Sequence, residues 1–403
     1  MHILSSHNRS EFLACPQLVR FDYASGQSHF EPTLLVKGST LLLKYVVMGV
    51  RMQMVFSRLG DRLVYGLKVF DDPEKAATLW SIVERKEELA ALAALSTGEP
   101  CQVFLFNEIA VCVGWRETTI NIPLSKFQML SSGVETEAVD YSSLSQQVSA
   151  LLDRPSLDDV PGNTVVIDID GSKDWRPSIN HFITNNASAS SLDLFDRDEG
   201  NQQEQIGIWL TDSLHPSGSH HSPQIPKGSQ TRELTDILLS YDHGSMLIES
   251  KALSIFPRDV LPSRARLAKD ISGHVKKAVS QLRGGIRKIK AGVPVMNFEG
   301  ETIEVERTRP MHAIVLIPDL DLIEDQHQYD SAFMAEFMEA TGGFLHLLDV
   351  AELLRVVQAA EMIAARGTTT TPMMAFDYYL IERAKTALQA GSLCFEMLLR
   401  FEG

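Results

Sequence analysis

The amino-acid sequence predicts an α/β protein in which a central mixed sheet is flanked by helices and preceded by a β-rich N-terminal domain. From residue 231 onward the patterns alternate as strand hairpin, helix, strand, helix, strand and helix, which is the order of a layered α/β domain. Between residues 34 and 123 most apolar runs are short and separated by polar turns, which is typical of β-rich structure. A length of 403 residues allows two or three domains.

Composition narrows the class of protein. An apolar fraction of 44% and a mean hydropathy of -0.04 are typical of a globular chain in water. No apolar run approaches the roughly 18 residues of a membrane helix, and the N-terminus lacks the apolar core of a secretion signal. The four cysteines are scattered without metal-type spacing. We therefore expect a reduced, cytoplasmic protein without a membrane partner.

Residues 1–130 are expected to form the β-rich domain with one long helix. Acids and a proline in Asp71-Asp72-Pro73-Glu74 are typical of a first helical turn, and the predicted helix reaches about Leu95. The residues show no catalytic constellation, so we expect a recruitment or regulatory domain that docks a protein partner. Strands are predicted at 34–36, 41–47, 51–57, 62–70, 101–107, 110–116 and 118–123.

Residues 131–205 show the weakest periodicity and are treated as a connecting region, with a short helix at 145–152 and a buried strand at 164–168. The run VVIDIDGS (165–172) resembles the first motif of haloacid-dehalogenase-type phosphotransferases. By that resemblance Asp168 is the nucleophile and Asp170 the acid or base. A strand that ends in an acidic turn accounts for the same run, so the phosphotransferase is kept as a lesser alternative.

The stretch 206–230 begins with a predicted strand at 206–210 and continues as a predicted mobile loop at 215–230, which is rich in Ser, Gly, Pro and His. His215, His220 and His221 are ligands that transition metals accept. No cysteine or spaced acid completes a set of four ligands, so metal-free loop histidines are the simpler interpretation.

Two predicted strands, 234–240 and 246–253, form a hairpin around Asp242-His243-Gly244-Ser245, where Gly244 is free to take a positive φ. Because side chains alternate along a strand, Glu249 and Lys251 leave the same face. An antiparallel hairpin brings Asp236 beside Glu249. Two carboxylates and a lysine on one strand face are costly unless they are paired, hydrated or holding a cation.

Basic residues concentrate after this hairpin. Residues 251–290 contain eleven Lys and Arg but only two acids, a net charge of +9 in a chain whose total is -15. A helix follows with a buried stripe from Val275 to Ile289, and Gln281 borders this stripe, where it can lean over the strands. A basic region inside an acidic protein suits contact with a polyanion, although a solvated helix face is the simpler alternative. The candidate nucleic-acid contacts are Arg258, Arg264, Arg266, Lys276, Lys277, Arg283 and Lys288.

Two more strands, at 311–318 and 343–349, alternate with helices at 332–340 and 350–366, and Asp349 is the expected N-cap of the second helix. The predicted α/β core therefore spans 206–366. A helical tail at 367–403 closes the chain.

The pattern of Asp236, Glu249 and Lys251 on a hairpin, followed by a basic helix with Gln281, resembles the PD-(D/E)XK nuclease superfamily over roughly residues 231–350. The resemblance implies a restriction-endonuclease-like core and hydrolysis of phosphodiester bonds, with DNA as the expected substrate. It implies Mg²⁺ or Mn²⁺ held by Asp236, Glu249 and the backbone carbonyl of Ser250, with Glu233 as an extra ligand. Lys251 would orient or deprotonate the attacking water, and Gln281 would help to position water or strand. The family's proline is absent, since Thr235 precedes Asp236.

Two alternatives to a nuclease stay open. The same hairpin could be a salt-bridged sheet edge in a non-catalytic nucleic-acid-binding or regulatory protein with a degenerate nuclease fold. The lesser alternative is the phosphotransferase centred on Asp168. The sequence leaves DNA versus RNA, endo- versus exonuclease action, sequence specificity, pathway and assembly into a homo-oligomer undecided.

Overall fold

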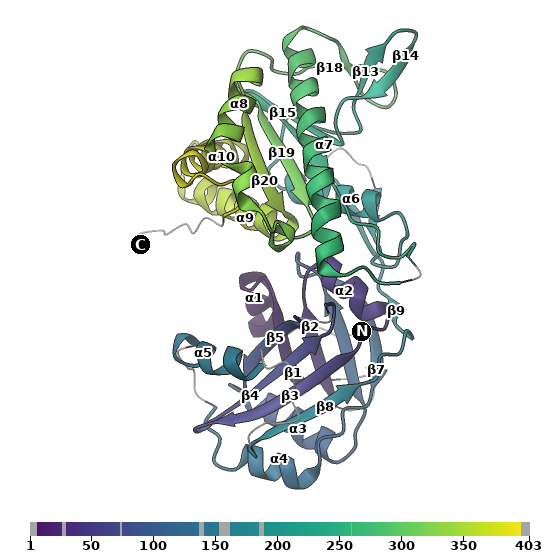
Figure 1. Ribbon diagram of the computed structural model, residues 1–403, viewed down its shortest axis with the longest axis vertical. Helices are drawn as coiled ribbons and strands as arrows, with labels where there is room; N and C mark the ends of the chain where they lie inside the picture. Colours follow the sequence, from purple (N-terminus) through teal and green to yellow (C-terminus); the bar gives the residue numbers. More distant parts are fainter. Residues whose placement is uncertain are drawn as a thin grey trace. The chain divides into compact units, whose positions relative to one another are not determined.

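The computed structural model of the protein describes residues 6–25, 30–72, 75–136, 141–152, 162–184, 189–258 and 260–395. The chain divides into two compact units (Figure 1). The N-terminal unit comprises Met1–Asn180, Asp193–Phe195 and Ile255–Arg264, and the C-terminal unit comprises His181–Leu192, Asp196–Ser254 and Ala265–Gly403. Both contain helices and sheets, so the prediction of a mixed α/β protein is confirmed.

The N-terminal unit contains two sheets, ordered β1-β2-β6-β7-β9 and β5-β4-β3-β8. Strands β2 and β6 are parallel and the other neighbours are antiparallel. Apolar side chains of both sheets form one core cluster with α2 and α3. The elements are α1 (Ser6–Ala14), β1 (Leu18–Ser25), β2 (Phe30–Lys37), α2 (Thr40–Val47), β3 (Met52–Leu59), β4 (Arg62–Val69), β5 (Ala77–Ile82), α3 (Lys86–Ser96), β6 (Cys101–Phe106), β7 (Cys112–Thr118), α4 (Leu124–Ser131), α5 (Tyr141–Leu152), β8 (Thr164–Ile169) and β9 (Arg176–Pro177).

The strands predicted at 34–36, 51–57, 62–70, 101–107, 110–116 and 164–168 are confirmed, but residues 41–47 form α2 instead of a strand. The Ser39 side chain accepts a hydrogen bond from the Leu42 N–H. The Glu108 carboxylate accepts from the N–H and hydroxyl of Thr40, at 2.6 and 2.7 Å. A cap and a negative charge at the first turn stabilise a helix that the β-branched and apolar residues alone do not predict.

The long helix predicted over 71–95 is also wrong. Residues Ala77–Ile82 form β5, which pairs antiparallel with β4 along its whole length, and only Lys86–Ser96 form a helix, α3. Pro73 and Glu74, the expected helix start, lie outside the described residues. The sequence patterns also do not predict β1, and 119–123 is not a strand. Pairing with a partner strand outweighs the local helix signals here.

The C-terminal unit contains the sheet that carries the predicted site residues. Within the described residues, no helix is both long and apolar enough to span a membrane. Residues 396–403, the end of the predicted helical tail, lie outside the described part of the chain. The elements are β10 (Asn180–Ile183), β11 (Ala189–Leu192), α6 (Glu199–Asp212), β12 (Gly218–His221), β13 (Gln224–Lys227), β14 (Gln230–Glu233), β15 (Ile237–Tyr241), β16 (Gly244–Ser250), α7 (Arg264–Lys290), β17 (Val295–Met296), β18 (Thr302–Ile303), β19 (His312–Ile317), η1 (Leu320–Leu322), η2 (Gln326–Tyr329), α8 (Ser331–Thr341), β20 (Phe344–Asp349), α9 (Val350–Arg366) and α10 (Pro372–Ala390).

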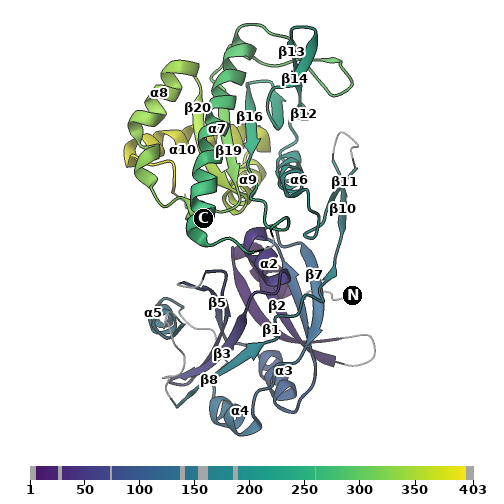
Figure 2. The same ribbon diagram turned by 45° about the vertical axis from the view of Figure 1, so that its right-hand side comes forward.

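The main sheet of this unit has the order β12-β15-β16-β19-β20. Its first three strands are antiparallel, whereas β16, β19 and β20 are parallel. Helices α7 and α6 each pack close to a face of the sheet, and the approach is allowed by a glycine in each (Figures 1 and 2). A Cβ on Gly285 of α7 would lie 3.0 Å from Leu247, and one on Gly207 of α6 would lie 3.0 Å from Ile237. Because Leu247 and Glu249 share a strand face, α7 covers the face that carries Glu249.

Three local predictions in this unit are wrong. Residues 206–210 lie within α6, whose N-cap Asp198 accepts a hydrogen bond from the Asn201 N–H. The predicted loop 215–230 contains β12 and β13. Gly244 pairs with Tyr241 within the hairpin and is not among the glycines with positive φ. This glycine is needed for space, since a Cβ there would collide with the Tyr241 hydroxyl.

Candidate active site

The hairpin β15–β16 brings the predicted acidic residues together. Ile237 pairs with Ile248, so the preceding residue, Asp236, lies opposite Glu249. Asp236 comes just before β15, whereas the sequence patterns predict it inside the strand. Lys251 follows β16 directly, and its backbone N–H donates to the Leu316 carbonyl of β19 at 2.8 Å. The parallel neighbour therefore fixes the backbone from which Lys251 extends.

The two carboxylates converge on one point. The Lys251 ammonium lies 2.7 Å from Glu249 Oε2 and 3.1 Å from Asp236 Oδ2. Asp236 Oδ2 also accepts the Ser250 backbone N–H at 2.6 Å. Glu249 is only 1% exposed and Asp236 is 8% exposed. The sequence-predicted triad of Asp236, Glu249 and Lys251 is thus assembled in the structure.

Burial dominates the electrostatics of these groups. It raises the pKa of Glu249 to about 7, with repulsion from Asp236 adding to the effect and Lys251 opposing it. Burial likewise raises the pKa of Asp236, again against the attraction of Lys251. Burial would lower the pKa of Lys251, but Glu249 and Asp236 together raise it. The negative charge of the two ionised carboxylates therefore exceeds the positive charge of Lys251.

Two further acids approach this pair from other elements. Glu204 of α6 forms a 2.8 Å contact with the His221 ring of β12, and its charge contributes to the raised pKa of Asp236. Glu233 ends β14, and burial raises its pKa, with Asp236 and Glu204 adding to the effect. Sequence patterns place Glu233 at the start of the Asp236 strand, whereas the structure places it on a separate strand.

Glu204 is the functional candidate that the sequence patterns missed. It lies one turn before Ile208 on α6, and the run Ile206–Leu210 resembles a strand because it is short and apolar. The signal that could have found it is Asp198, an N-cap residue followed by three Gln and two Glu, which are good helix formers. A helix assignment there would have placed an acid upstream of the hairpin.

Helix α7 contributes His274 near the triad, and not Gln281. His274 donates a hydrogen bond to the backbone of Ala252. Burial lowers the pKa of His274, and the positive charge of Lys251 adds to this effect. Gln281 lies two turns further along, is exposed, and has no hydrogen bond to Asp236 or Glu249 in the described structure. The role predicted for Gln281 therefore stays a prediction.

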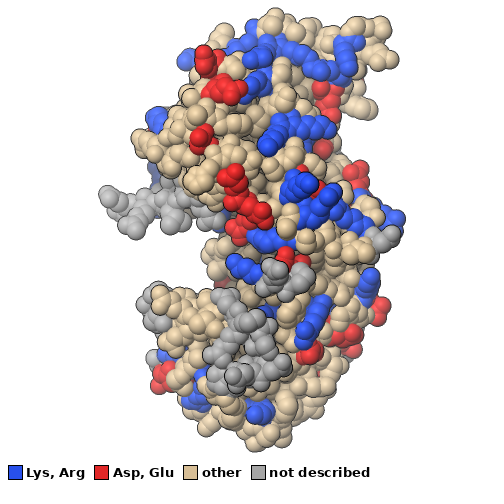
Figure 3. All heavy atoms as spheres, in the orientation of Figure 1, with Lys and Arg blue, Asp and Glu red and all other residues tan. Residues whose placement is uncertain are grey.

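The basic residues predicted to contact nucleic acid differ in the unit that contains them and in their ion pairs. Arg258 and Arg264 belong to the N-terminal unit. On α7, Arg266 pairs with Asp270 at 3.1 Å and Arg283 pairs with Glu336 at 2.9 Å. The other three candidates on this helix, Lys276, Lys277 and Lys288, are exposed or half-buried, and Figure 3 shows Lys and Arg side chains gathered along α7.

The phosphotransferase candidate Asp168 and the histidines of β12 do not form a buried cluster like that of Asp236, Glu249 and Lys251. Asp168 lies on β8, which pairs with β3, and its exposed carboxylate accepts a hydrogen bond from Gln53 at 2.9 Å and pairs with Arg51. His220 and His221 are neighbours on β12, so their side chains leave opposite faces of the strand.

The donor set can be tested against Mg²⁺ or Mn²⁺. Asp236 and Glu249 offer carboxylate oxygens, the ligands these ions prefer, and both oxygens lie within 3.1 Å of one point, Lys251 Nζ. In the described part of the chain, no three His, Cys, Asp or Glu side chains lie close enough to hold a metal ion. A hard cation here would take two carboxylates from these side chains and its remaining ligands from water or backbone oxygens.

Comparison with known proteins adds no assignment, because no family model, curated protein or solved structure matches the chain.

Proposed function

We propose that the C-terminal unit is a divalent-metal-dependent nuclease that hydrolyses phosphodiester bonds of DNA, with a restriction-endonuclease-like core. The observation that carries the proposal is the convergence of Asp236 and Glu249 on Lys251 at the C-terminal end of β16, the central strand of a mixed sheet. Buried acids whose pKa values are raised, beside one lysine, are more typical of a functional site than of a sheet edge.

In this proposal Asp236, Glu249 and the Ser250 carbonyl would hold Mg²⁺ or Mn²⁺. Such an ion supplies Lewis acidity toward a phosphate and toward an attacking water. Ser250 also fixes Asp236, because its backbone N–H donates to Oδ2. Glu204 adds negative charge near Asp236, and His221 holds the Glu204 carboxylate in place at 2.8 Å.

Lys251 is assigned the stabilisation of negative charge. Two carboxylates within 3.1 Å of its ammonium keep the side chain protonated, so it is better placed to donate to a phosphate oxygen than to accept a proton. The resemblance to nucleases allowed either role. The ion-pair geometry favours donation.

The position of the Lys251 ammonium also supports the non-catalytic alternative. With Lys251 between them, Asp236 and Glu249 already form a compact internal salt bridge, and a metal ion would need that place. A binding protein with a degenerate nuclease fold would show this arrangement permanently. The two hypotheses differ in whether metal and substrate displace Lys251 from between the carboxylates.

Helix α7 has two basic flanks with different surroundings. On one flank Arg283 pairs with Glu336, while Arg287 and Lys290 donate to the Ala340 and Gly342 carbonyls at the end of α8. These cations stabilise a helix C-terminus. We call this the α8 flank, and helical spacing places Lys276 on it as well.

The opposite flank begins at His274, beside Lys251, and continues through Lys277, Gln281 and Lys288 at helical spacing. We call it the site flank. Lys277 and Gln281 are exposed. We propose that this flank contacts the phosphates of a substrate strand leading to the carboxylates. Residues 1–130 of the N-terminal unit, which show no catalytic constellation, are assigned to recruitment or regulation through a protein partner.

The proposed function is tested by incubating the full chain with supercoiled, linear and single-stranded DNA and with RNA, each with Mg²⁺, Mn²⁺ or a chelator. We expect cleavage of DNA with either ion and none with the chelator. Conversion of supercoiled into open circular plasmid indicates endonuclease action. Binding of DNA without cleavage of any substrate, with either ion, would support the non-catalytic alternative.

The flanks of α7 make a separate prediction about salt. On duplex DNA each phosphate contact contributes about -0.9 to the slope of log affinity against log salt concentration. Lys277→Ser and Lys288→Ser should each make this slope shallower by about 0.9. Lys276→Ser, a matched control one residue away on the α8 flank, should leave it unchanged. Equal effects at Lys276 and Lys277, measured by fluorescence anisotropy over a salt series, would contradict the assignment of one flank to DNA.

A further inference from the structure

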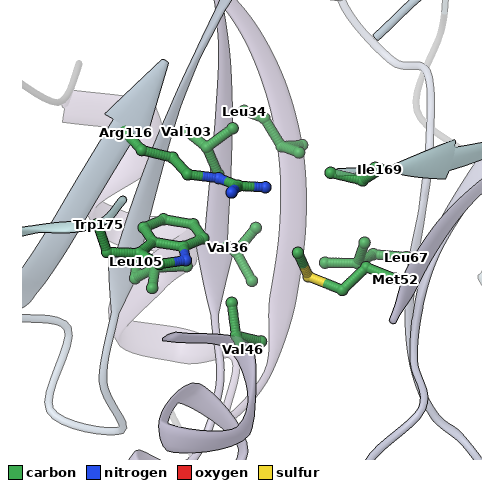
Figure 4. A pocket seen from close by; sticks show the side chains of 10 residues that line it. All are labelled: Leu34, Val36, Val46, Met52, Leu67, Val103, Leu105, Arg116, Ile169 and Trp175. Atoms are coloured by element: carbon green, nitrogen blue, oxygen red, sulfur yellow. The ribbon is translucent and has the colours of Figure 1, made fainter. Parts of the chain in front are cut away.

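A small cavity lies between the two sheets of the N-terminal unit. Leu34 and Val36 of β2 and Leu105 of β6 line it from one sheet, and Met52 and Ile169 line it from the other (Figure 4). Its volume is about 10 Å³, which is close to the minimum that one water-sized particle needs. All its lining side chains except Arg116 and Trp175 are Leu, Val, Ile or Met.

The two exceptions place unused hydrogen-bond donors at this cavity. Arg116 of β7 is 3% exposed and Trp175, just before β9, is 7% exposed. The Arg116 Nη1 group donates to the Ser172 carbonyl at 2.9 Å, and Nη2 donates to the Asp170 carbonyl. Arg116 Nε and Trp175 Nε1 are buried and have no partner in the described structure. Figure 4 shows the guanidinium extending into the space between the sheets.

The charge of Arg116 is also incompletely compensated. In the described structure the guanidinium contacts two backbone carbonyls and the face of the Trp175 ring, not a carboxylate. Burial lowers the pKa of Arg116, while Asp170 and Asp174, both exposed, oppose that effect. A buried cation without a paired anion is costly. The site therefore favours a negatively charged occupant.

The chemistry of the donors separates an anion from a water molecule. Arg116 and Trp175 side chains only donate, and the remaining lining side chains are apolar. A water there would accept two hydrogen bonds but would find no side-chain acceptor for its own hydrogens. A monatomic anion accepts both hydrogen bonds and needs no acceptor.

We propose that this cavity binds a single halide ion, chloride under ordinary conditions, which accepts hydrogen bonds from Arg116 Nε and Trp175 Nε1. The ion is held only when both sheets are folded, because Arg116 comes from β7 and the cavity's other wall comes from β3 and β8. Chloride therefore stabilises the N-terminal unit, and the stabilisation grows with the logarithm of chloride concentration above half-saturation. This site is independent of the proposed nuclease activity.

The test is thermal unfolding of the full chain in potassium chloride and in potassium gluconate at equal ionic strength. We expect the unfolding midpoint to rise by a similar increment with each tenfold increase in chloride and to rise less in gluconate. Arg116→Met should abolish the difference between the two salts. Arg176→Met is the matched control. The guanidinium carbon of Arg176 lies 4.6 Å from the centroid of the Trp115 ring in the same sheet, but Arg176 is exposed. It should keep the full chloride effect.

Trp175→Phe covers the case in which Arg116→Met does not fold, since it keeps an aromatic ring against Arg116 and removes only the N–H donor. It should reduce the chloride effect. A crystal of the parent protein in bromide should show one anomalous peak between Arg116 and Trp175. Equal midpoints in chloride and gluconate, or bromide-containing crystals with no peak there, would overturn the proposal and indicate a water or an empty cavity.

Discussion

Replacing Lys251 by alanine should lower the rate of DNA cleavage by about 10²- to 10⁴-fold, while DNA affinity stays within several-fold of the parent. The ammonium lies 2.7 Å from Glu249 and 3.1 Å from Asp236, so it can stabilise charge on a phosphate bound beside them. The substitution leaves both carboxylates in place to hold a metal ion. Single-turnover cleavage and equilibrium binding, measured on the same DNA, separate the two effects.

The matched control for this change is Lys276→Ala, which removes an exposed lysine from the α8 flank of α7 and should cleave at the parental rate. Circular dichroism establishes that both variants are folded. If Lys251→Ala, folded, cleaves DNA at the parental rate, Lys251 has no catalytic role. If it only weakens DNA binding, the non-catalytic alternative gains support.

Replacing Glu249 by alanine should weaken Mg²⁺ or Mn²⁺ binding by more than about 100-fold, measured by calorimetry. It should leave the thermal midpoint without metal unchanged or slightly higher. Glu249 is 1% exposed, and burial raises its pKa from 4.5 to about 7. Since the folded-state pKa is the higher one, ionisation of Glu249 costs stability as the pH rises from 4.5 through about 7. The thermal midpoint of Glu249→Ala, relative to that of the parent, should therefore rise as the pH increases across this range.

Asp168→Ala is the control for metal binding, because Asp168 is an exposed acid on β8 of the other unit and should not affect the ion. The account is contradicted if Glu249→Ala unfolds the chain or lowers its thermal midpoint by many degrees, and if the parent shows no heat of metal binding. Asp236, Glu249 and Lys251 would then form a structural salt bridge.

The hairpin and its triad were predictable because they depend on local rules. Strand alternation puts Glu249 and Lys251 on one face, and the number of residues between Asp236 and Glu249 allows a two-residue turn to place them opposite one another. The stripe from Val275 to Ile289 predicts α7 for the same reason, since a buried helix face needs a 3.6-residue period.

The failures occur where distant contacts decide. Residues 41–47 have strand-like composition, yet a Glu108 carboxylate 68 residues away caps them as a helix. Residues 77–82 lie in a helical pattern, yet they pair with β4. The same effect hid Glu204, because the apolar run on α6 resembles a strand when its packing against Ile237 is unknown. The sheet face that approaches Gln281 depends on how α7 is rotated, and sequence spacing alone does not determine that rotation.

The central claim is that cleavage takes place at the Asp236–Glu249–Lys251 site. The most direct measurement compares the initial rates at which the parent, Lys251→Ala and Asp168→Asn convert supercoiled plasmid into open circles with Mn²⁺. The account predicts equal rates for the parent and Asp168→Asn, and a loss of about 10²-fold or more for Lys251→Ala. Nicking that survives in Lys251→Ala but is lost in Asp168→Asn would contradict it, as would no metal-dependent nicking by the parent.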